Sequence, residues 1–369
     1  MEAQVYSESK STTNWNQVYA LLGLNAAVVI SWIAYHNYQP KVLELFNFQE
    51  LALFLVVAQA VILVCIPPIA GAIGDYMIKS NGNRFLVFMV GTSVTAMTFM
   101  AVAFTVGTAN VLSLTPALPV MIVIWLISMN IFHSPANSML ELFAPTKELP
   151  LAMAMLAMTT ELLYAIEPIV VWFVDLIGPV LTFVTGGVLL IVTGYFFRRT
   201  TQNLTLSREY NETKQNVQNN FPVVLIAGMV LGLVTAILMN VFPDLLAQRL
   251  ATYSHTALGG SHFVSLILGL SALAALPMAK VIEKLGAGLS LTLGLIGCFV
   301  FISGIYFVQN EFTTMLFMVL LAVSYSLSTV SAFPFALYNL SPKMVTFGAG
   351  IFFGSMELAD GLMNVFQKL

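Results

Sequence analysis

Charge is what this sequence has least of. Charged residues make up only 8% of its 369 residues, whereas a soluble domain carries about a quarter. The apolar types AVILMFWYC account for 59%, and the mean hydropathy is +0.89. Such a chain cannot cover a folded core with polar surface, so a water-soluble enzyme and a nucleic-acid-binding protein are excluded. We expect its solvent to be a lipid bilayer.

Cysteine is nearly absent as well. Cys65 and Cys298 lie in different apolar segments, which excludes a disulfide framework and a thiolate metal site. No phosphate-binding glycine loop, HExxH or CxxC pattern is found, so we expect no nucleotide, metal or other cofactor. The polar start MEAQVYSESKSTTN lacks the basic-then-apolar order of a cleaved signal peptide. The first apolar segment is therefore expected to stay in the protein.

Long apolar runs are what the sequence does contain. A helix crossing the bilayer needs about 20 apolar residues, and this length predicts an all-α polytopic membrane protein with eleven spans. They are residues 15–36, 50–73, 84–106, 117–141, 149–174, 178–197, 221–247, 261–282, 287–308, 312–337 and 344–366.

The basic residues predict the orientation of these spans. With the N-terminus in the cytoplasm, eleven basic residues are cytoplasmic: Lys10, Lys79, Arg84, Lys147, Arg198, Arg199, Arg208, Lys214, Lys280, Lys284 and Lys343. Only three, Lys41, Arg249 and Lys368, fall on the other side. The positive-inside rule therefore predicts a multi-pass protein of the plasma (inner) membrane with a cytoplasmic N-terminus.

Landmarks recur along the chain at an offset of about 200 residues. Pro40, Pro68, Pro135 and Glu161 correspond in order to Pro243, Pro277, Pro334 and Glu357. This order predicts an internal duplication. Both copies start in the cytoplasm, so we expect two parallel repeats related by an axis along the membrane normal.

The duplication predicts the domain boundaries. We expect a cytoplasmic tail (1–14), an N-terminal six-helix bundle (15–197), a polar cytoplasmic linker (198–220) and a C-terminal five-helix bundle (221–369). The sixth span has no counterpart in the second half. We therefore expect the second bundle to be truncated and a twelfth span to be missing after Leu369; the alternative is an eleven-span variant that ends outside.

The stretch from Pro67 to Arg84 is predicted to be a helix end followed by a polar turn. Gly71 and Asp75 are one helical turn apart, and Gly82, Asn83 and Arg84 follow. This pattern resembles the signature between the second and third spans of the major facilitator superfamily, with Tyr76 at a position that is usually basic. The equivalent stretch of the second half has lysines instead. We expect an inner gate or, alternatively, a solvated turn; the gate residues would be Gly71, Asp75, Lys79, Arg84, Lys280 and Lys284.

A narrower resemblance is carried by the fourth span. The run from Asn130 through Pro135-Ala-Asn137 to Glu141 and Pro145 is similar to the corresponding segment of sucrose–proton symporters and of the glycoside–pentoside–hexuronide symporter-like branch. The arginine that those relatives carry near Asn137 is absent. The resemblance implies a symporter of a sugar or related metabolite.

Four acidic residues inside predicted spans are candidates for proton coupling: Glu161, Glu167, Glu357 and Asp360. Each costs about 2.5–3.5 kcal/mol to place in a bilayer, so each is expected to have a functional or structural role. Glu357 and Asp360 are one turn apart and would titrate as a pair. Hydrogen bonding to neighbouring hydroxyls is the structural alternative. For Glu167, which precedes Pro168, a local structural role is an equal alternative.

Neutral polar and aromatic side chains are candidates for a substrate cavity: Tyr35, His36, Asn130, His133, Asn137, Tyr164, Ser324, Ser328 and Asn364. Asn130, His133 and Asn137 recur at helical spacing and form one stripe. Some have a structural alternative: His133 as a helix contact, the serines as packing residues, and the aromatic residues at the end of the first span as interface anchors.

These features predict a secondary active transporter that moves a small solute by alternating access, coupled to H⁺ or to Na⁺. The alternative is a transporter-like sensor or scaffold that does not transport. An intramembrane aspartyl protease is excluded, because Asp75 and Asp360 lie at different depths and cannot face each other. We expect no enzymatic activity.

Overall fold

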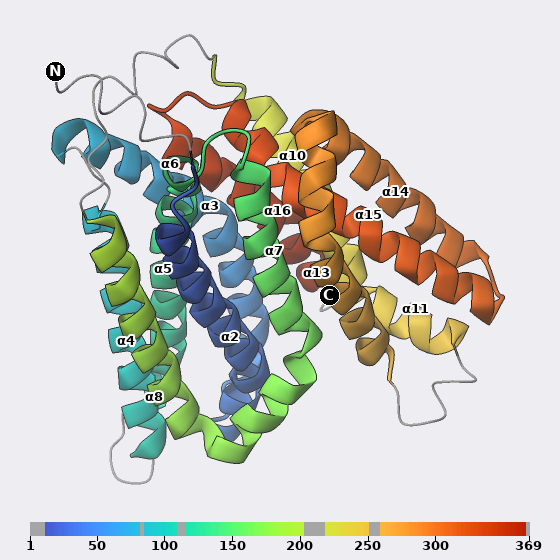
Figure 1. Cartoon of the computed structure of the whole chain (residues 1–369). Helices are drawn as coiled ribbons and strands as arrows, with labels where there is room; N and C mark the ends of the chain where they lie inside the picture. Colours follow the sequence, from blue (N-terminus) through green and yellow to red (C-terminus); the bar gives the residue numbers. More distant parts are fainter. Residues whose placement is uncertain (1–11, 82–84, 109–114, 203–217, 251–258, 367–369) are drawn as a thin grey trace, which may run out of the picture.

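The computed structural model describes residues 12–81, 85–108, 115–202, 218–250 and 259–366, which are helical apart from short connections (Figure 1). The long helices are α2 (Trp15–Leu45), α3 (Ala52–Asn81), α4 (Phe85–Gly107), α5 (Leu118–Asn137), α7 (Leu149–Ala165), α8 (Glu167–Thr201), α10 (Phe221–Asn240), α13 (Gly260–Leu285), α14 (Ala287–Phe307), α15 (Glu311–Tyr338) and α16 (Val345–Phe366). The short ones are η1 (Gln49–Leu51), η2 (Thr115–Ala117), α6 (Leu140–Phe143) and α11 (Phe242–Arg249). The predicted all-helical class is confirmed.

Each predicted span overlaps one to three of these helices. In the described part of the chain, nine helices are long and apolar enough to cross a membrane, and α7 is a shorter apolar helix. The α16 helix, which covers the predicted eleventh span, is not among the nine. The chain is thus a multi-pass membrane protein, and the count of eleven spans stays a prediction.

The predicted turn after residue 73 is wrong. α3 continues through the polar stretch to Asn81, because residues 75–80 contain no proline or glycine and the next helix-ending residues are Asn81 and Gly82. The predicted linker also begins inside a helix, since α8 runs on to Thr201. Residues 203–217, which make up most of that linker, lie outside the described residues, as does Arg84.

The predicted fifth span is interrupted rather than continuous. α7 ends at Ala165 and α8 begins at Glu167, with Pro168 in its first turn. Proline fits that position because the first N–H groups of a helix have no internal partner. The reversal into the predicted sixth span occurs at Gly178, whose φ of 78° is open to glycine at little cost.

The outside of the bundle is apolar while its interior holds polar groups. Large hydrophobic side chains are exposed along several helices, including Met97 on α4, Leu273 on α13 and Val300 on α14. Acidic and hydroxyl side chains such as Asp75, Glu161 and Ser271 are buried. A water-soluble protein has the opposite distribution, with an apolar core and a polar surface. The distribution seen here suits a bilayer, because apolar surface is stable against lipid tails and not against water.

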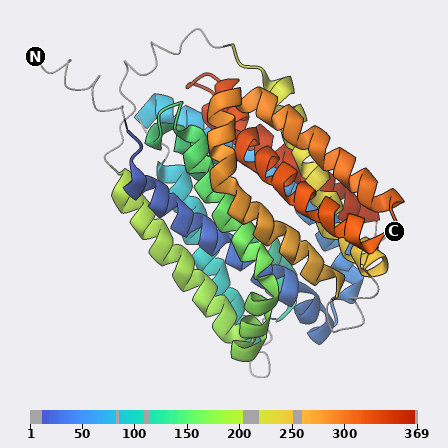
Figure 2. The same cartoon turned by 45° about the vertical axis from the view of Figure 1, so that its right-hand side comes forward.

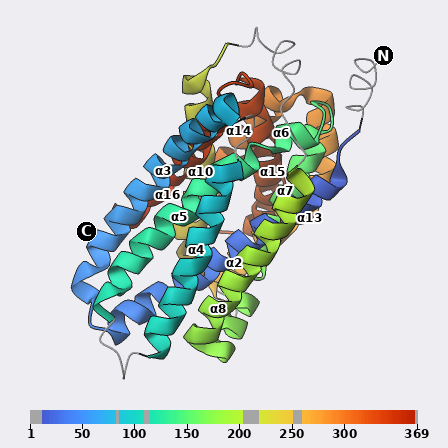
Figure 3. The ribbon, with the colours of Figure 1, turned by 90° about the vertical axis from the view of Figure 1, so that its left-hand side faces the viewer.

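The helices form two groups, α2–α8 and α10–α16, which lie left and right in Figure 1. Two helix pairs make the main contacts between the groups. α3 runs beside α16, as Figure 3 shows, and α7 runs beside α13, as Figure 2 shows. Under the predicted repeat, α3 corresponds to α13 and α7 to α16. The two pairs are therefore equivalent, although the domain boundaries themselves stay predictions.

Close backbone approach fixes the α3–α16 pair. A Cβ atom added to Gly350 would collide with the carbonyl of Pro67, and one added to Gly71 would collide with the carbonyl of Thr346. Only residues without a side chain allow helix axes this close. The pair is consequently packed backbone against backbone at several turns.

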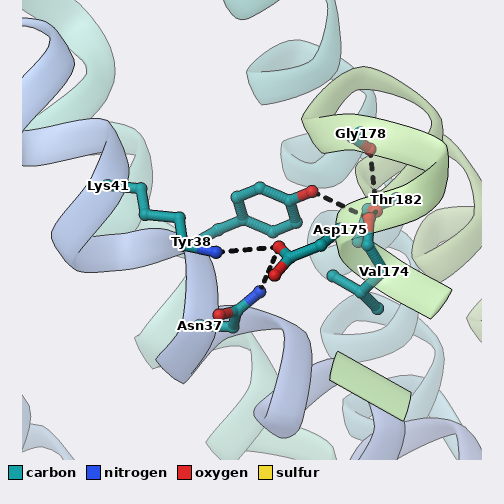
Figure 4. A network of polar contacts seen from close by, with 7 residues as sticks. All are labelled: Asn37, Tyr38, Lys41, Val174, Asp175, Gly178 and Thr182. Atoms are coloured by element: carbon teal, nitrogen blue, oxygen red, sulfur yellow. Dashed lines mark hydrogen bonds and ion pairs between the residues drawn. The ribbon is translucent and has the colours of Figure 1, made fainter. Parts of the chain in front are cut away.

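A polar network braces the end of the first group opposite to the linker (Figure 4). The ammonium of Lys41 and the amide of Asn37, both on α2, contact Asp175 Oδ1 at 2.7 and 2.9 Å. The hydroxyl of Tyr38 donates to the carbonyl of Val174 at 2.9 Å. These bonds hold α2 against the segment that leads into the Gly178 turn.

Candidate functional site

Asp75 joins the two groups of helices at the end of the bundle where α8 ends and α10 begins, here called the linker end. Its carboxylate is buried and accepts hydrogen bonds from the backbone N–H groups of Thr346 (3.1 Å) and Phe347 (2.8 Å). Both N–H groups belong to the first turn of α16, where a helix has free donors and a positive dipole end. Asp75 of α3 thus serves as a cap for a helix of the other group.

Other bonds join the groups at the same end. The hydroxyl of Ser134 donates to the carbonyl of Thr346 at 3.0 Å, and the hydroxyl of Tyr338 donates to the carbonyl of Thr146 at 2.8 Å. With Asp75, these contacts come from α3, α5, α15 and α16. The linker end is therefore closed between the two groups.

The lysines named as gate residues take a different place. Lys79, Lys280 and Lys284 are exposed and form no hydrogen bond or ion pair within the described part of the chain. Arg84 lies outside the described residues. The structure thus brings Gly71 and Asp75 together with α16 and leaves the lysines at the surface. A clasp between Asp75 and opposing lysines is not formed, since the α16 terminus supplies the donors.

Glu161 is buried where α7 meets α13 and α15. It is 4% exposed. The hydroxyl of Thr329 on α15 donates to Glu161 Oε1 at 2.8 Å. Glu161 Oε2 is buried without a hydrogen-bond partner in the described residues, and Ser271 on α13 adjoins the same carboxyl. This acid therefore lies in the contact between the two groups.

Asp360 and Glu357 belong to a second polar cluster, formed with Asn240, His36 and Tyr164. The amide of Asn240 on α10 donates to Asp360 Oδ1 at 2.8 Å. His36 on α2 lies within electrostatic range of Asp360, and Tyr164 on α7 lies within range of Asp360 and Glu357. The cluster thus draws side chains from both groups of helices, and two of its members are carboxylates one turn apart.

His133 lies on the same side of the first group as this cluster. Its half-buried ring contacts Phe353 of α16, with ring centroids 4.8 Å apart. The His36 ring is exposed and stacks obliquely on Trp32. Both histidines therefore contact or face helices of the second group, as a residue lining a route between the groups would.

Several predicted cavity residues lie elsewhere. Tyr35 stacks on Trp125 and lines an apolar pocket inside the first group. Asn130 and Asn137 donate to carbonyls of their own helix, at Leu126 and His133. Their amides thus satisfy the helix backbone.

The serines of α15 also face away from the first group. Ser324 and Ser328 pack against Gly297 and Gly294 of α14, so a helix-packing role accounts for them. Glu167 is half-buried at the start of α8 and lies within electrostatic range of Tyr164. The Asn364 side chain lies outside the described residues.

Sequence reasoning missed three partners of the buried acids: Asn240, Thr329 and Ser271. Hydroxyl and amide residues are common in membrane helices, and their partners depend on helix rotation. The sequence signal that could have identified these three residues is that they lie at the same depth in the membrane as the buried acids.

The comparisons with known proteins agree with this architecture. The family model described as "Major Facilitator Superfamily" matches residues 17–362. No curated protein sequence matches the chain. Solved structures share the fold at low identity. The human organic anion transporter TETRAN is 12% identical, with a TM-score of 0.65 over 95% of this chain and 93% of that one.

Two further structures cover the chain to a similar extent. A bacterial homologue of the iron transporter ferroportin, in an outward-facing state, is 13% identical with a TM-score of 0.66, over 95% of this chain and 91% of that one. The E. coli fucose:proton symporter is 12% identical with a TM-score of 0.65, over 94% and 89%. Since the family model spans nearly the whole sequence, the chain belongs to the Major Facilitator Superfamily, whose members are membrane transporters of small molecules rather than enzymes.

Proposed function

We propose that this protein is a secondary active transporter that moves a small solute across the cell membrane by alternating access, coupled to protons. The linker end faces the cytoplasm in this proposal, as the distribution of basic residues suggests. The observation that carries the proposal is that buried acids such as Glu161 lie between two groups of helices. Contacts of side chains with helix ends, such as those of Asp75, hold the two groups together at the linker end.

The Asp75 contact supports a reversible gate. A carboxylate that caps a helix of the other group contributes about 1.5–3 kcal/mol, as hydrogen bonds to charged groups do. A clasp of that size holds a closed state and can still be broken by a bound solute. In this proposal, Gly71 and Asp75 form the inner gate with the first turn of α16, and the exposed lysines surround it.

Proton coupling is assigned to Glu161 and to the Glu357–Asp360 pair. Acids within a membrane bundle mark ion or proton pathways by default, and the predicted repeat relates Glu161 to Glu357. The substrate route runs beside His36, His133 and Tyr164, which lie at or near the contact between the groups. Sugars are a reasonable first substrate class, because a fucose:proton symporter shares the fold.

The test is uptake into proteoliposomes that contain the purified protein. Radiolabelled fucose, other monosaccharides, organic acids and nucleosides are screened by counterflow, and each hit is then measured with and without an inward proton gradient in sodium-free buffer. We expect accumulation above equilibrium only with the gradient. Accumulation that needs Na⁺ instead would reassign the coupling ion, and no counterflow with any probe would favour a sensor or scaffold.

The acids are tested in the same vesicles. Glu161→Gln and Glu357→Gln keep the size of the side chain and remove its titration. We expect both variants to retain counterflow, while the accumulation driven by the proton gradient falls by about tenfold or more. The control is Glu283→Gln, an exposed residue of α13. Normal accumulation in both acid variants would rule out the assigned coupling sites.

A further inference from the structure

A groove opens on the second group of helices at the end opposite to the linker end, where α11 lies (Figure 1). Its walls are the end of α10, the α11 helix and the last turns of α14. The side chains that line it include Ile237, Val241, Leu245, Ile302, Ser303 and Tyr306. It encloses about 260 Å³, which is room for several methylene groups, since one water takes about 30 Å³ in the liquid. Here it is called the α10–α14 groove.

The α10–α14 groove is mostly apolar and opens towards the lipid. Val241 and Tyr306 in its walls are exposed, while Phe242 beside them is buried. Large apolar side chains are also exposed farther along both helices, such as Leu233 on α10 and Val300 on α14. Water would find few hydrogen-bond partners in such a groove. An acyl chain needs none, so the walls of the groove suit lipid.

The corresponding place in the first group is filled by protein. Under the predicted repeat, α2 corresponds to α10 and α4 to α14. The second part of α8 packs along both α2 and α4, where Thr193 lies beside Gly23 and Gly187 lies against Phe99. Among the described residues, no equivalent of that part of α8 packs on α10 and α14. The α10–α14 groove therefore has room for another apolar occupant.

Arg249 lies at the edge of this groove. Its guanidinium, at the end of α11, donates to the carbonyl of Tyr306 in the groove wall. That carbonyl belongs to the last turn of α14, so the contact also caps the helix. One donor is enough for this cap, and a guanidinium has five. The Nε–H group is buried and has no hydrogen-bond partner among the described residues.

The remaining donors of Arg249 suit a phosphate group. A guanidinium presents its N–H groups in a planar fork that matches the oxygens of phosphate. No carboxylate of the described residues forms an ion pair with Arg249, whereas Lys41, at the same end of the bundle, is paired with Asp175. Lys368, the third basic residue predicted at this end, lies outside the described residues. A cation without an acidic partner thus stands beside an apolar groove.

We propose that the α10–α14 groove binds an anionic phospholipid. One acyl chain lies between α10 and α14, and the phosphate accepts hydrogen bonds from the Arg249 guanidinium, Nε–H included. The negative charge of the lipid matches the positive charge of Arg249. A zwitterionic headgroup carries its own cation and gains less from this contact. The inference goes beyond the proposed function, because it does not depend on any transported solute.

The site is tested by photolabelling the purified protein in lipid nanodiscs. One probe is phosphatidylglycerol with a diazirine on one acyl chain, and the other is phosphatidylcholine with the same diazirine. Labelled peptides are identified by mass spectrometry. We expect the phosphatidylglycerol probe to label residues 237–245 and 302–307 about tenfold more than the phosphatidylcholine probe does, as hydrogen bonds to a charged group imply. Unlabelled phosphatidylglycerol should displace it, and glycerophosphoglycerol, which lacks acyl chains, should not.

Two variants separate the headgroup contact from the chain contact. Arg249→Gln removes the charge and keeps a donor for the Tyr306 carbonyl, so labelling by the phosphatidylglycerol probe should fall about tenfold, to the level of the phosphatidylcholine probe. Ser303→Trp fills the groove and leaves Arg249 in place, so both probes should lose the groove. Lys41→Gln is the matched control, because Lys41 is basic, lies at the same end and already has an acidic partner. It should label as the unchanged protein does.

Equal labelling of the groove by both probes in the unchanged protein, or full labelling in Arg249→Gln, overturns the anionic site. Absence of groove labelling with either probe overturns it as well, and would mean that protein rather than lipid covers α10 and α14. If Arg249→Gln does not give a folded protein, Ser303→Trp and the comparison of the two probes carry the same decision. Uptake is not measured, so this result is independent of the proposed transport.

Discussion

Asp75 illustrates how one side chain can link two halves of a membrane protein. Each of its two oxygens accepts one N–H from the first turn of α16. An asparagine has one acceptor oxygen, and its NH₂ would face an N–H donor. The substitution therefore removes one bond and adds a repulsive contact at a buried position. Little in the immediate surroundings can compensate, since the site is 4% exposed.

We therefore predict that Asp75→Asn speeds amide hydrogen exchange at Thr346 and Phe347 by about tenfold, which corresponds to about 1.4 kcal/mol. Exchange followed by mass spectrometry on peptides from the start of α16 measures this. Asp175→Asn, at the opposite end of the first group, should leave these peptides unchanged. Equal protection in Asp75→Asn would mean that the carboxylate does not hold the helix end.

At the same scale, the sequence indicates which residues are unusual but not what they touch. Glu161 and Asp360 stand out because ionisable groups are rare in apolar spans. Ser271 and Thr329 do not, since hydroxyl residues are frequent there. Whether Ser328 faces α14 or the other half depends on the rotation of α15, which side-chain packing sets. The acids were therefore predictable and their hydrogen-bond partners were not.

At the scale of helices, the α3–α16 pair depends on glycine. A Cβ atom on Gly350 would overlap the Pro67 carbonyl, and backbone cannot move aside as a flexible side chain can. Gly350→Ala must therefore push the helices apart at the centre of the contact. Overpacking of this kind costs about 1–3 kcal/mol.

We expect Gly350→Ala to lower the thermal unfolding midpoint in detergent by roughly 3–10 °C, measured by intrinsic fluorescence. Gly23→Ala is the control, because the nearest side-chain atom to its added Cβ is 4.0 Å away and alanine favours a helix interior over glycine. Its midpoint should stay equal or rise. A fall of the same size in both variants would indicate a general sensitivity to substitution rather than close packing.

Helix ends were the least predictable part of the elements. Apolar runs locate the spans, but α3 continues through a polar stretch to Asn81, since hydrophobicity does not report where a helix stops. Conversely, the break at Ile166 and the reversal at Gly178 lie within or beside apolar sequence. The reversal depends on the backbone conformation of the single residue Gly178, and an average of hydrophobicity along the sequence does not detect it.

At the scale of the whole molecule, the predicted duplication relates the two contacts between the groups. If α3 corresponds to α13 and α7 to α16, then the α3–α16 and α7–α13 pairs are one arrangement used twice. Their chemistry differs, since one is built on glycine and the other on alanine around Glu161. Each encloses a buried acid, Asp75 in the first and Glu161 in the second. Asp75 accepts backbone N–H groups of a helix end, whereas Glu161 accepts a threonine hydroxyl, so the two acids are held by different donors.

Alternating access requires the linker end to open. Thr146 and Tyr338 meet across it through a hydrogen bond of 2.8 Å, so Thr146→Cys and Tyr338→Cys can be joined by a short, disulfide-forming cross-linker. We predict that the cross-link abolishes solute uptake in proteoliposomes and that a reductant restores it, because a tethered end can neither open nor exchange solute.

The matched control pair is Asn37→Cys with Asp175→Cys, two residues that contact each other within one group (Figure 4). Joining them should leave uptake unchanged, since α2 and the start of α8 move as one body in the proposed cycle. If the cross-group link permits full uptake, the two groups do not separate at the linker end. If both links stop uptake, movement within the first group is also required, and rocking of two rigid halves is then an insufficient description.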